Sequence, residues 1–301
     1  DAMARNVGTD GRARFQTRYH GAFTGRNTGA GFQPLNLSRG FDGDEVPPEQ
    51  LVHNIRKRDA KWLDVLYGDA MDAVAKSTRH WIRSEAGCTI YAGDFVSVEA
   101  VLLSCLAGEE WKIEAFRNKV KIYELMADKI YNLPPGTVNK IDFPVERQDG
   151  KTGELAFGYQ GALGAWLKFD SSGRHTDERI LEICRAWRKE HPNIVEFWGA
   201  LERAAKRAIK YKGTICSAGP FISFQYVDDW LSMIAPDGKR IWYYKAYTRK
   251  NVRPHWHKPR ENEDCLVGEC DCGYTSKIMY MSYKEGHWKW VSTYGGKFSE
   301  N

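Results

Sequence analysis

The sequence has no long uninterrupted apolar run. Its longest apolar stretch, residues 96–108, contains Glu99 and falls well short of the roughly 20 apolar residues that cross a bilayer. The N-terminus does not show the charged, apolar and cleavable order of a secretory signal peptide, and Asp1-Ala2-Met3-Ala4 resembles a remnant added around a start methionine. We therefore expect an intracellular protein with no membrane partner.

Cysteines are few, and internal repeats and low-complexity tracts are absent. Seven cysteines among 301 residues are an odd number, and a chain of this length can bury a core without disulfides, so we expect reduced thiols. A hydrophobic fraction of 42% excludes disorder, collagen and coiled coil as descriptions of the whole chain. The length predicts one large globular domain or two ordinary ones.

Basic and aromatic residues are plentiful. The chain has 44 Lys and Arg against 39 Asp and Glu, a net charge of +5, with 11 Trp and 15 Tyr. Cations contact phosphates and aromatic rings stack on bases, so this composition permits binding to a nucleic acid. The composition alone does not select that function.

Periodicity and turn residues predict an order of elements. The first 45 residues are rich in Gly, Arg and Asn and indicate loops and short strands. Later segments predict two or three short helices within 48–84, a strand at 88–95, helices at 98–106, 110–131, 147–168, 176–190 and 195–212, and strands at 221–234 and 239–247. This order favours an α+β fold in which a helical block is inserted between parts of one sheet.

The segment 147–168 is predicted to be helical although it contains Gly153, Gly158, Gly161 and Gly164. Each glycine should destabilise a helix by about 1 kcal/mol relative to alanine. We therefore expect another group to approach this backbone closely.

Two patterns in the chain have the chemistry of a nucleotide site. Asp94 lies at the end of the predicted strand and Glu99 at the start of the next helix, where a carboxylate can hold a hard cation such as Mg²⁺. The second pattern is a row spaced by four residues that would share one helix face: Arg147, Lys151, Leu155 and Tyr159. Its cations suit a triphosphate and its ring can cover a base. Each pattern by itself has an alternative without function. The carboxylates can be a solvated strand-end Asp94 and a surface Glu99, and the row of four can be a solvated basic helix face.

The residues around these patterns resemble known motifs. Residues 94–100 (Asp-Phe-Val-Ser-Val-Glu-Ala) resemble motif A of the family A, polymerase I-like, DNA polymerases, and Arg147 with residues 150–161 resembles the motif B helix of their bacteriophage-type branch. Residues 24–26 with 33–37 resemble the motif that contacts primer and template, and residues 293–297 with 300–301 resemble the stretch before a late DNA-contacting palm helix. The four motifs follow the order of the family and span nearly the whole chain.

The resemblance implies a role for each matching position. Asp94 would be catalytic and bind two Mg²⁺ ions, with the Phe95 carbonyl beside them, in a two-metal displacement that extends a primer from a deoxynucleoside triphosphate. Lys151 and Arg147 would grip the triphosphate, and Lys151 would also donate a proton to pyrophosphate. Glu99 would exclude the ribose 2′-OH and so favour deoxynucleotides.

The remaining matching positions would contact the sugar and the DNA. Leu155 departs from the aromatic residue common in cellular members, so the packing on the sugar differs here. The DNA contacts that the resemblance implies are Tyr159 at the template side of the new pair, Arg26 at the primer terminus, Gln33 and Asn36 at the template, and Lys297 in the last motif.

The family also uses a second catalytic aspartate in a His-Asp-Glu motif, which these 301 residues do not contain. The sequence therefore predicts one part of a polymerase whose palm and thumb are incomplete, with a complementary C-terminal fragment as a further partner beside primer-template DNA. A viral member would work in the cytoplasm of its host. The alternative is a catalytically incomplete DNA-binding fragment, and a zinc-dependent binding module is the third hypothesis.

The resemblance also implies a division into palm and fingers. Residues 5–99 and 226–301 would form parts of the palm, and residues 100–225 would form the helical fingers with the motif B helix.

Three other patterns compete with this interpretation. Tyr226-Val227-Asp228-Asp229 resembles the metal-binding hairpin of reverse transcriptases, although its place among the motifs favours solvated aspartates at a strand end. Gly150-Lys151-Thr152 ends like a P-loop but lacks the glycine five positions earlier. Six residues offer irregularly spaced zinc ligands without a Cys-x-x-Cys pair: His255, His257, Cys265, Cys270, Cys272 and His287.

Overall fold

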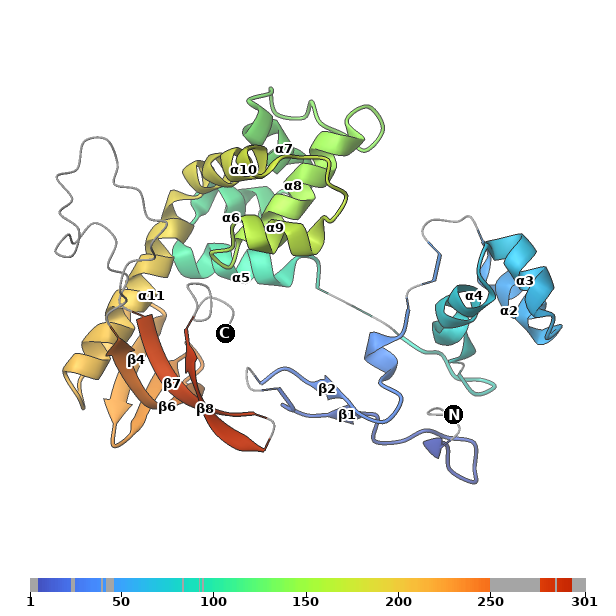
Figure 1. Cartoon of the computed structure of the whole chain (residues 1–301), viewed down its shortest axis with the longest axis horizontal. Coiled ribbons are helices and arrows are strands. Elements are labelled where there is room, and N and C mark those ends of the chain that lie inside the picture. The colour runs from blue at the N-terminus through green and yellow to red at the C-terminus, as the bar shows by residue number, and fades with distance from the viewer. Residues whose placement is uncertain are drawn as a thin grey trace. The chain divides into compact units, whose positions relative to one another are not determined.

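The computed structural model describes residues 5–22, 25–38, 40–41, 46–82, 84–91, 93, 95–249, 277–284 and 286–293. The chain divides into two compact units, Asp1–Asp94 and Phe95–Asn301, and it mixes helices with antiparallel strands (Figure 1). Within the described residues, no helix combines the length and the apolar character needed to cross a membrane.

The first unit consists of short elements. Asp59 and Asp69 cap two of its helices, because their carboxylates accept hydrogen bonds from backbone N–H groups of the first turn. Leu51, Leu63 and Ala73 are the centre of its small core. Its elements are β1 (Thr17–Arg18), β2 (Thr28–Gly29), η1 (Pro34–Asn36), α2 (Pro48–Arg56), α3 (Ala60–Tyr67), α4 (Ala70–Ser77) and η2 (Thr78–Trp81). These bounds confirm the short helices expected within residues 48–84.

The strand expected at residues 88–95 is wrong for the part of that segment that the structure describes, residues 88–91, 93 and 95. These residues join no β-ladder, and Ile90, Tyr91 and Phe95 are 56%, 93% and 81% exposed. Their alternation of apolar residues predicts a half-buried strand, but a strand also needs a neighbour to pair its N–H and C=O groups. The described residues supply no such neighbour to this segment.

Seven helices are described in the second unit. They are α5 (Val98–Ala107), α6 (Glu110–Arg117), α7 (Ile122–Tyr131), α8 (Pro144–Phe157), α9 (Leu163–Phe169), α10 (Asp177–Glu190) and α11 (Pro192–Lys210). The expected helix 110–131 is broken after Arg117, where Lys119 has a φ of 55° that no helix interior adopts. The expected helix 147–168 is likewise two helices, with a turn at residues 158–162.

Among the four glycines at which a close approach was expected, the tightest approach is at Gly161, and Gly150, which was not among them, shows another. A Cβ on Gly150 would lie 2.2 Å from the backbone oxygen of Tyr123, so this glycine lets α7 and α8 cross at short range. A Cβ on Gly161 would lie 2.0 Å from the backbone oxygen of Ala156, within the turn that follows α8. By contrast, Gly164 has open space around it.

The six strands of the second unit form one antiparallel sheet in the order β3-β4-β5-β6-β7-β8, so each strand pairs with its neighbour in the sequence. The turn Ala235–Gly238 joins β5 to β6 as predicted, with Ala235 N–H donating to the Lys239 carbonyl at 2.9 Å. The strands are β3 (Ile215–Ala218), β4 (Ile222–Val227), β5 (Trp230–Ile234), β6 (Arg240–Arg249), β7 (Lys277–Lys284) and β8 (His287–Ser292).

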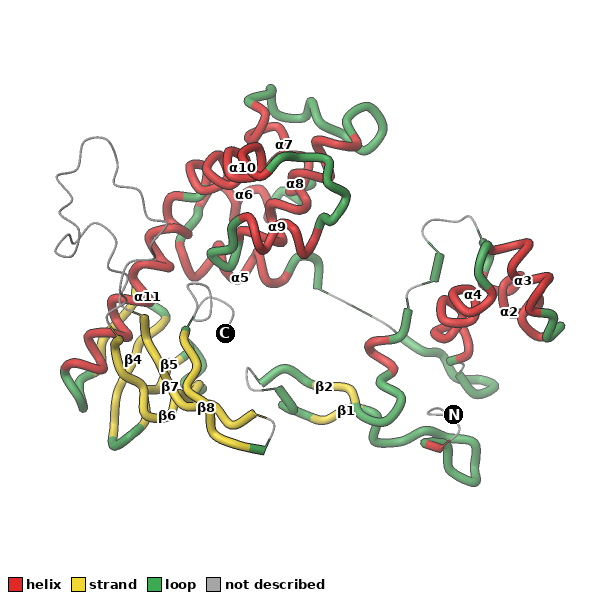
Figure 2. The backbone as a smooth tube through the Cα atoms, viewed as in Figure 1, coloured by secondary structure: helices red, strands yellow, loops and turns green. Residues whose placement is uncertain are grey.

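Helix α11 links the helical block to the sheet. It runs from the other helices along the strands, and its buried face packs on β3, β4, β5 and β6 (Figures 1 and 2). One core therefore extends from Phe157, Trp166 and Trp187 among the helices to Phe224 and Tyr243 in the sheet. The observed units divide at residues 94 and 95. The expected palm and finger boundaries, 99/100 and 225/226, remain predictions.

Candidate functional site

The row of four residues lies on α8 and in the turn beyond it. Arg147, Lys151 and Leu155 are on the helix, but Tyr159 lies past its last residue, Phe157. This corrects the expectation of a single helix through all four positions. The helix ends because Gln160 has a φ of 61° and because Gly161 bends the chain tightly against Ala156.

Helix α8 separates a buried face from an accessible edge. Leu155 is 37% exposed and Lys151 is half-buried, so this edge is open to a ligand. Asp149, Thr152, Glu154 and Phe157 point the other way and are all buried. The polar residues on the buried face fix the orientation of the edge.

The two cations of the row have different surroundings. Arg147 Nε donates to Glu124 Oε1 on α7 at 3.2 Å, so its charge is partly compensated. Lys151 forms no ion pair with any residue in the described part of the chain. Lys151 is therefore the cation of this row that can turn to an anionic ligand without breaking a salt bridge.

A buried ion pair holds α8 against the other helices. Lys112 Nζ on α6 donates to Glu154 Oε2 at 2.5 Å and to His191 Nε2 at 3.0 Å. The indole Nε1–H of Trp187 on α10 donates to Glu154 Oε1 at 2.9 Å. Both charges are thus hydrogen-bonded, which is the condition under which a buried pair is tolerated.

His191 is neutral in this network. Burial lowers the pKa of His191 from 6.5 to about 2, and the positive charge of Lys112 is the second cause of this shift. Because Nε2 accepts from Lys112, the proton is on Nδ1, which donates to the Trp187 carbonyl at 2.7 Å. The neutral imidazole therefore accepts one hydrogen bond and donates another without adding a second positive charge beside Lys112.

Asp149 ties α8 to the segment before α10. Its Oδ2 accepts from the Tyr131 hydroxyl at 2.5 Å and lies 2.8 Å from His175 Nε2. Burial, followed by the hydrogen bond that the hydroxyl donates to Asp149, raises the pKa of Tyr131 to about 12, so the phenol keeps its proton. Asp149 Oδ1 has no hydrogen bond, and Arg174 Nη2 is 3.5 Å away.

Helix α5 contacts the turn after α8 through Leu103. Leu103 Cδ2 lies 3.6 Å from the position that a Cβ on Gly158 would occupy. Glu99 is one turn before Leu103 on the same face, a rise of about 6 Å. Leu103 thus lies beside the turn that holds Tyr159, and Glu99, one turn earlier on α5, is exposed.

The other predicted site residues are elsewhere or outside the described residues. Gln33 and Asn36 adjoin each other in the first unit, where Asn36 Nδ2 donates to Gln33 Oε1 at 2.7 Å. Arg26, also in that unit, lies in the loop before β2. Phe95 is exposed at the start of the second unit. Asp94 and Lys297 lie outside the described residues.

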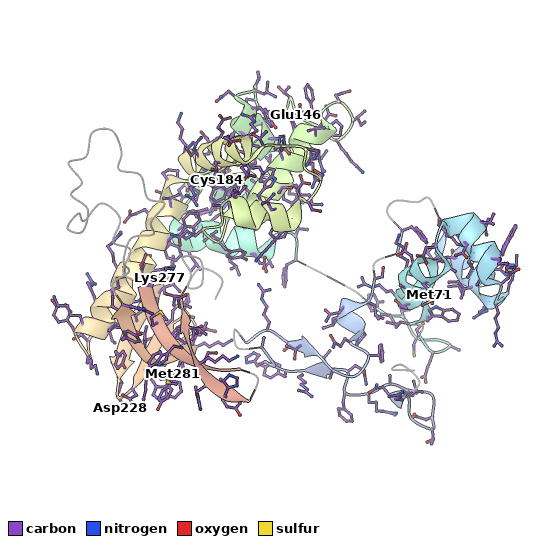
Figure 3. All side chains as sticks on the ribbon, viewed as in Figure 1. Met71, Glu146, Cys184, Asp228, Lys277 and Met281 are labelled. Carbon is purple, nitrogen blue, oxygen red and sulfur yellow. The ribbon has the colours of Figure 1, made fainter. Side chains whose placement is uncertain are left out.

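The competing patterns gain no support. Asp228 and Asp229 are exposed turn residues between β4 and β5, with Asp228 at a φ of 52° (labelled in Figure 3). Lys151 and Thr152 lie inside α8, where no phosphate-binding loop exists. The searched, described residues hold no group of three His, Cys, Asp or Glu that could bind a metal. The five zinc candidates at residues 255–272 lie outside them.

Sequence reasoning missed the residues behind the row. Glu154 follows Lys151 by three positions and could be assigned to the buried face by helical period alone, as could Asp149. The partners of Glu154 are distant in the sequence, with Lys112 42 residues away and Trp187 33 residues away, and no local pattern links such positions.

Comparison with known proteins gives one similar protein that bears on this site. The chain is 30% identical, over 303 aligned positions that include all of it, to a protein of Bacillus phage SP02 named DNA polymerase. The chain spans 43% of the length of that polymerase. No model of a known protein family matches the chain.

Proposed function

We propose that this chain is part of a DNA polymerase of family A and that it takes part in template-directed extension of a primer. The observation that carries the proposal is the similarity along its entire length to the phage DNA polymerase. The accessible row on α8 supports it, since a compensated arginine, a lysine without an ion pair in the described chain and an exposed leucine suit a nucleotide.

In this proposal the residues of α8 bind and orient the incoming deoxynucleoside triphosphate. Lys151 contacts the phosphates and holds a proton for the pyrophosphate that leaves, while Arg147 contacts them from one helical turn away. Leu155 packs on the sugar. Tyr159, in the turn after α8, packs against the new base pair, and Glu99 excludes the 2′-OH of a ribonucleotide. The buried pair of Lys112 and Glu154 keeps α8 in place during these contacts.

Mg²⁺ would supply the positive charge that stabilises the transferred phosphoryl group. Asp94 and the Phe95 carbonyl would hold it, and they are a small donor set for two ions. We infer that a further carboxylate comes from a second polymerase segment outside these 301 residues. The palm and fingers arrangement is part of the same proposal.

Primer extension tests this function. The chain is mixed with primer-template DNA, Mg²⁺ and four deoxynucleotides, with and without the C-terminal remainder of the phage polymerase that it resembles. Extension is expected only in the mixture, and Asp94→Ala should abolish it. Extension by the chain alone would refute the need for a second segment, and extension that survives Asp94→Ala would refute the role of this carboxylate.

The alternative is a DNA-binding fragment without catalytic capacity. It would bind primer-template DNA with the usual decrease in affinity as salt rises, but no added polymerase segment would restore extension. Direct binding of a deoxynucleoside triphosphate at Lys151 separates the two, because a fragment that only binds DNA has no use for it.

A further inference from the structure

The sheet of the second unit has two unlike faces. On one face the side chains of Phe224, Leu231 and Tyr243 are fully buried, and α11 packs on this side. The opposite face of β5 to β8 carries large aromatic side chains that remain accessible. We name this set the aromatic face: Trp230, Trp242, Tyr244, Tyr247, Tyr283, Trp288 and Trp290.

Strand register makes the aromatic face continuous. Trp230 pairs with Tyr244, Tyr244 with Met281, and Met281 with Trp290, so these side chains stand in line across four strands (Met281 is labelled in Figure 3). The ring centroids of neighbours are close, at 4.7 Å for Trp230 and Tyr244 and 5.3 Å for Tyr244 and Trp288. The rings form a platform that extends beyond any single pair.

The rings of this platform are open at their outer sides. Trp242, Trp288 and Trp290 are 43%, 50% and 49% exposed, and Tyr283 is 61% exposed. Cross-strand aromatic pairs do stabilise a sheet, and that role accounts for adjacent rings. It does not account for four tryptophans that keep so much of their surface in water.

The charged side chains that the strands themselves contribute are basic, whereas Asp228, Asp229 and Asp237 lie in the turns at the ends of the strands. None of the six strands contains Asp or Glu, although the whole chain has 39 acidic residues. Arg240 is held by Gln225 Oε1 at 3.1 Å and Ser232 Oγ at 2.9 Å, and its guanidinium lies 5.7 Å from the Trp242 ring centroid. Lys245 Nζ lies 5.3 Å from the Tyr244 ring.

Two further cations face each other across the sheet. Arg249 on β6 is directly opposite Lys277 on β7 in the register, on the same face as the rings (Lys277 is labelled in Figure 3). Cations thus occur beside the rings and at the end of the platform.

We propose that the aromatic face binds a single strand of DNA. Bases would stack on Trp242, Tyr244 and Trp288, and phosphates would be contacted by Arg240, Arg249 and Lys277. Sheet faces with exposed rings and nearby cations bind single strands because every unpaired base offers a ring to stack on. A duplex hides those ring faces, and a protein partner would not require a sheet without acidic residues.

This site is separate from the α8 row and uses none of its residues. The choice of DNA over another polyanion rests on the proposed function. The arrangement of rings and cations on the sheet is observed independently of that function. A polymerase that binds an unpaired strand here would hold template beyond the pair being formed. Loss of DNA binding at the aromatic face with intact triphosphate binding at the α8 row would refute only this inference. Loss of triphosphate binding with intact DNA binding would refute only the proposed function of the α8 row.

Fluorescence anisotropy of the full chain with a labelled oligothymidylate of about 20 nucleotides tests the proposal. Trp242→Ala and Trp288→Ala should each weaken binding about tenfold, because one stacked base is lost. Trp62→Ala is the matched control, since Trp62 is 43% exposed on α3, outside the sheet, and it should leave binding unchanged.

Two further measurements keep the test decisive. Arg249→Ala should reduce the dependence of affinity on salt by about one unit of slope, as expected when one phosphate contact is removed. Ultraviolet cross-linking of the wild-type chain to oligothymidylate should label peptides within residues 240–249 and 287–292, even if a tryptophan variant does not fold. Equal affinity of the tryptophan variants, preference for duplex or for oligouridylate, or no binding at low salt would overturn the proposal.

Discussion

At the scale of single residues, Lys151 is the most informative position of the α8 row. It forms no ion pair with the described residues, so its removal exposes no buried carboxylate and costs little stability. We predict that Lys151→Ala weakens binding of a fluorescent deoxynucleoside triphosphate about tenfold or more, because a hydrogen bond to a charged group contributes roughly 1.5–3 kcal/mol.

The matched control is Lys168→Ala on the adjacent helix α9. Lys168 is exposed and has the same charge, but it lies outside the row. Its removal should leave the affinity unchanged, as measured by equilibrium titration. Equal weakening by both substitutions would mean that only the overall charge attracts the triphosphate, and the site assignment would be wrong.

His191 predicts how stability depends on pH. Its pKa is lowered from 6.5 to about 2 by burial and by Lys112, so below pH 6.5 the unfolded chain takes up a proton that the folded chain does not. The free energy of unfolding should therefore fall as the pH falls below 6.5, with a contribution of up to about 1.4 kcal/mol per pH unit from this residue.

Urea unfolding at pH 7 and pH 5 measures this effect. The His191→Asn variant keeps an N–H donor for the Trp187 carbonyl and should lose less stability between the two pH values than the wild type does. His53→Asn, on the exposed surface of α2, should behave like the wild type. If His191→Asn and the wild type had the same pH dependence, the neutral buried imidazole would be ruled out.

At the scale of elements, Gly150 controls how closely α7 and α8 pack. A Cβ there would meet the backbone oxygen of Tyr123 at 2.2 Å, and a backbone atom cannot move aside as a flexible side chain can. We predict that Gly150→Ala destabilises the protein by about 1–3 kcal/mol, as overpacking does, although alanine is the better helix former.

Gly164→Ala provides the control within the same block. Gly164 lies on the exposed side of α9 with no atom within 4 Å of a new Cβ, so the substitution should be neutral or stabilise by up to about 1 kcal/mol. Both are measured by urea unfolding. Destabilisation by both variants to the same extent would indicate that the crossing of α7 and α8 does not depend on Gly150.

Many elements of this fold were predictable because their signals are local. Proline and glycine punctuate the chain, and residues such as Thr176, which caps α10, mark helix starts. The strand predicted at residues 88–95 is wrong for the described part of that segment, because a strand depends on a neighbour that local alternation does not reveal. The helix through Tyr159 was predicted wrongly because spacing by four does not show where a turn begins.

The site was predictable to a smaller extent. Spacing placed Arg147, Lys151 and Leu155 correctly on one helix. The residues that hold this helix were not predictable, because Lys112, Glu154 and His191 come from three distant segments. Helical period can show that a polar residue is buried, but it does not identify the residue with which it pairs. The aromatic face depends on strand register, which includes a bulge in β6 between Tyr244 and Tyr247.

At the scale of the whole molecule, the division into two units predicts independent folding of the larger one. The large core joins residues from α5 to β7, all within Phe95–Asn301, whereas the first unit has its own small core around Leu51 and Leu63. A unit that contains its own core can fold alone. We predict that residues 95–301 expressed alone unfold cooperatively in urea, with the midpoint that the same segment has in the whole chain.

A shorter fragment is the control for this prediction. Residues 144–301 lack α5, α6 and α7, and with them Leu103, Met126 and the Lys112 partner of Glu154, so the core is opened and a carboxylate is left buried without its cation. This fragment should show no cooperative transition by near-ultraviolet circular dichroism. Failure of 95–301 to fold, alongside folding of the whole chain, would mean that the first 94 residues stabilise the large core and that the two units are one cooperative structure.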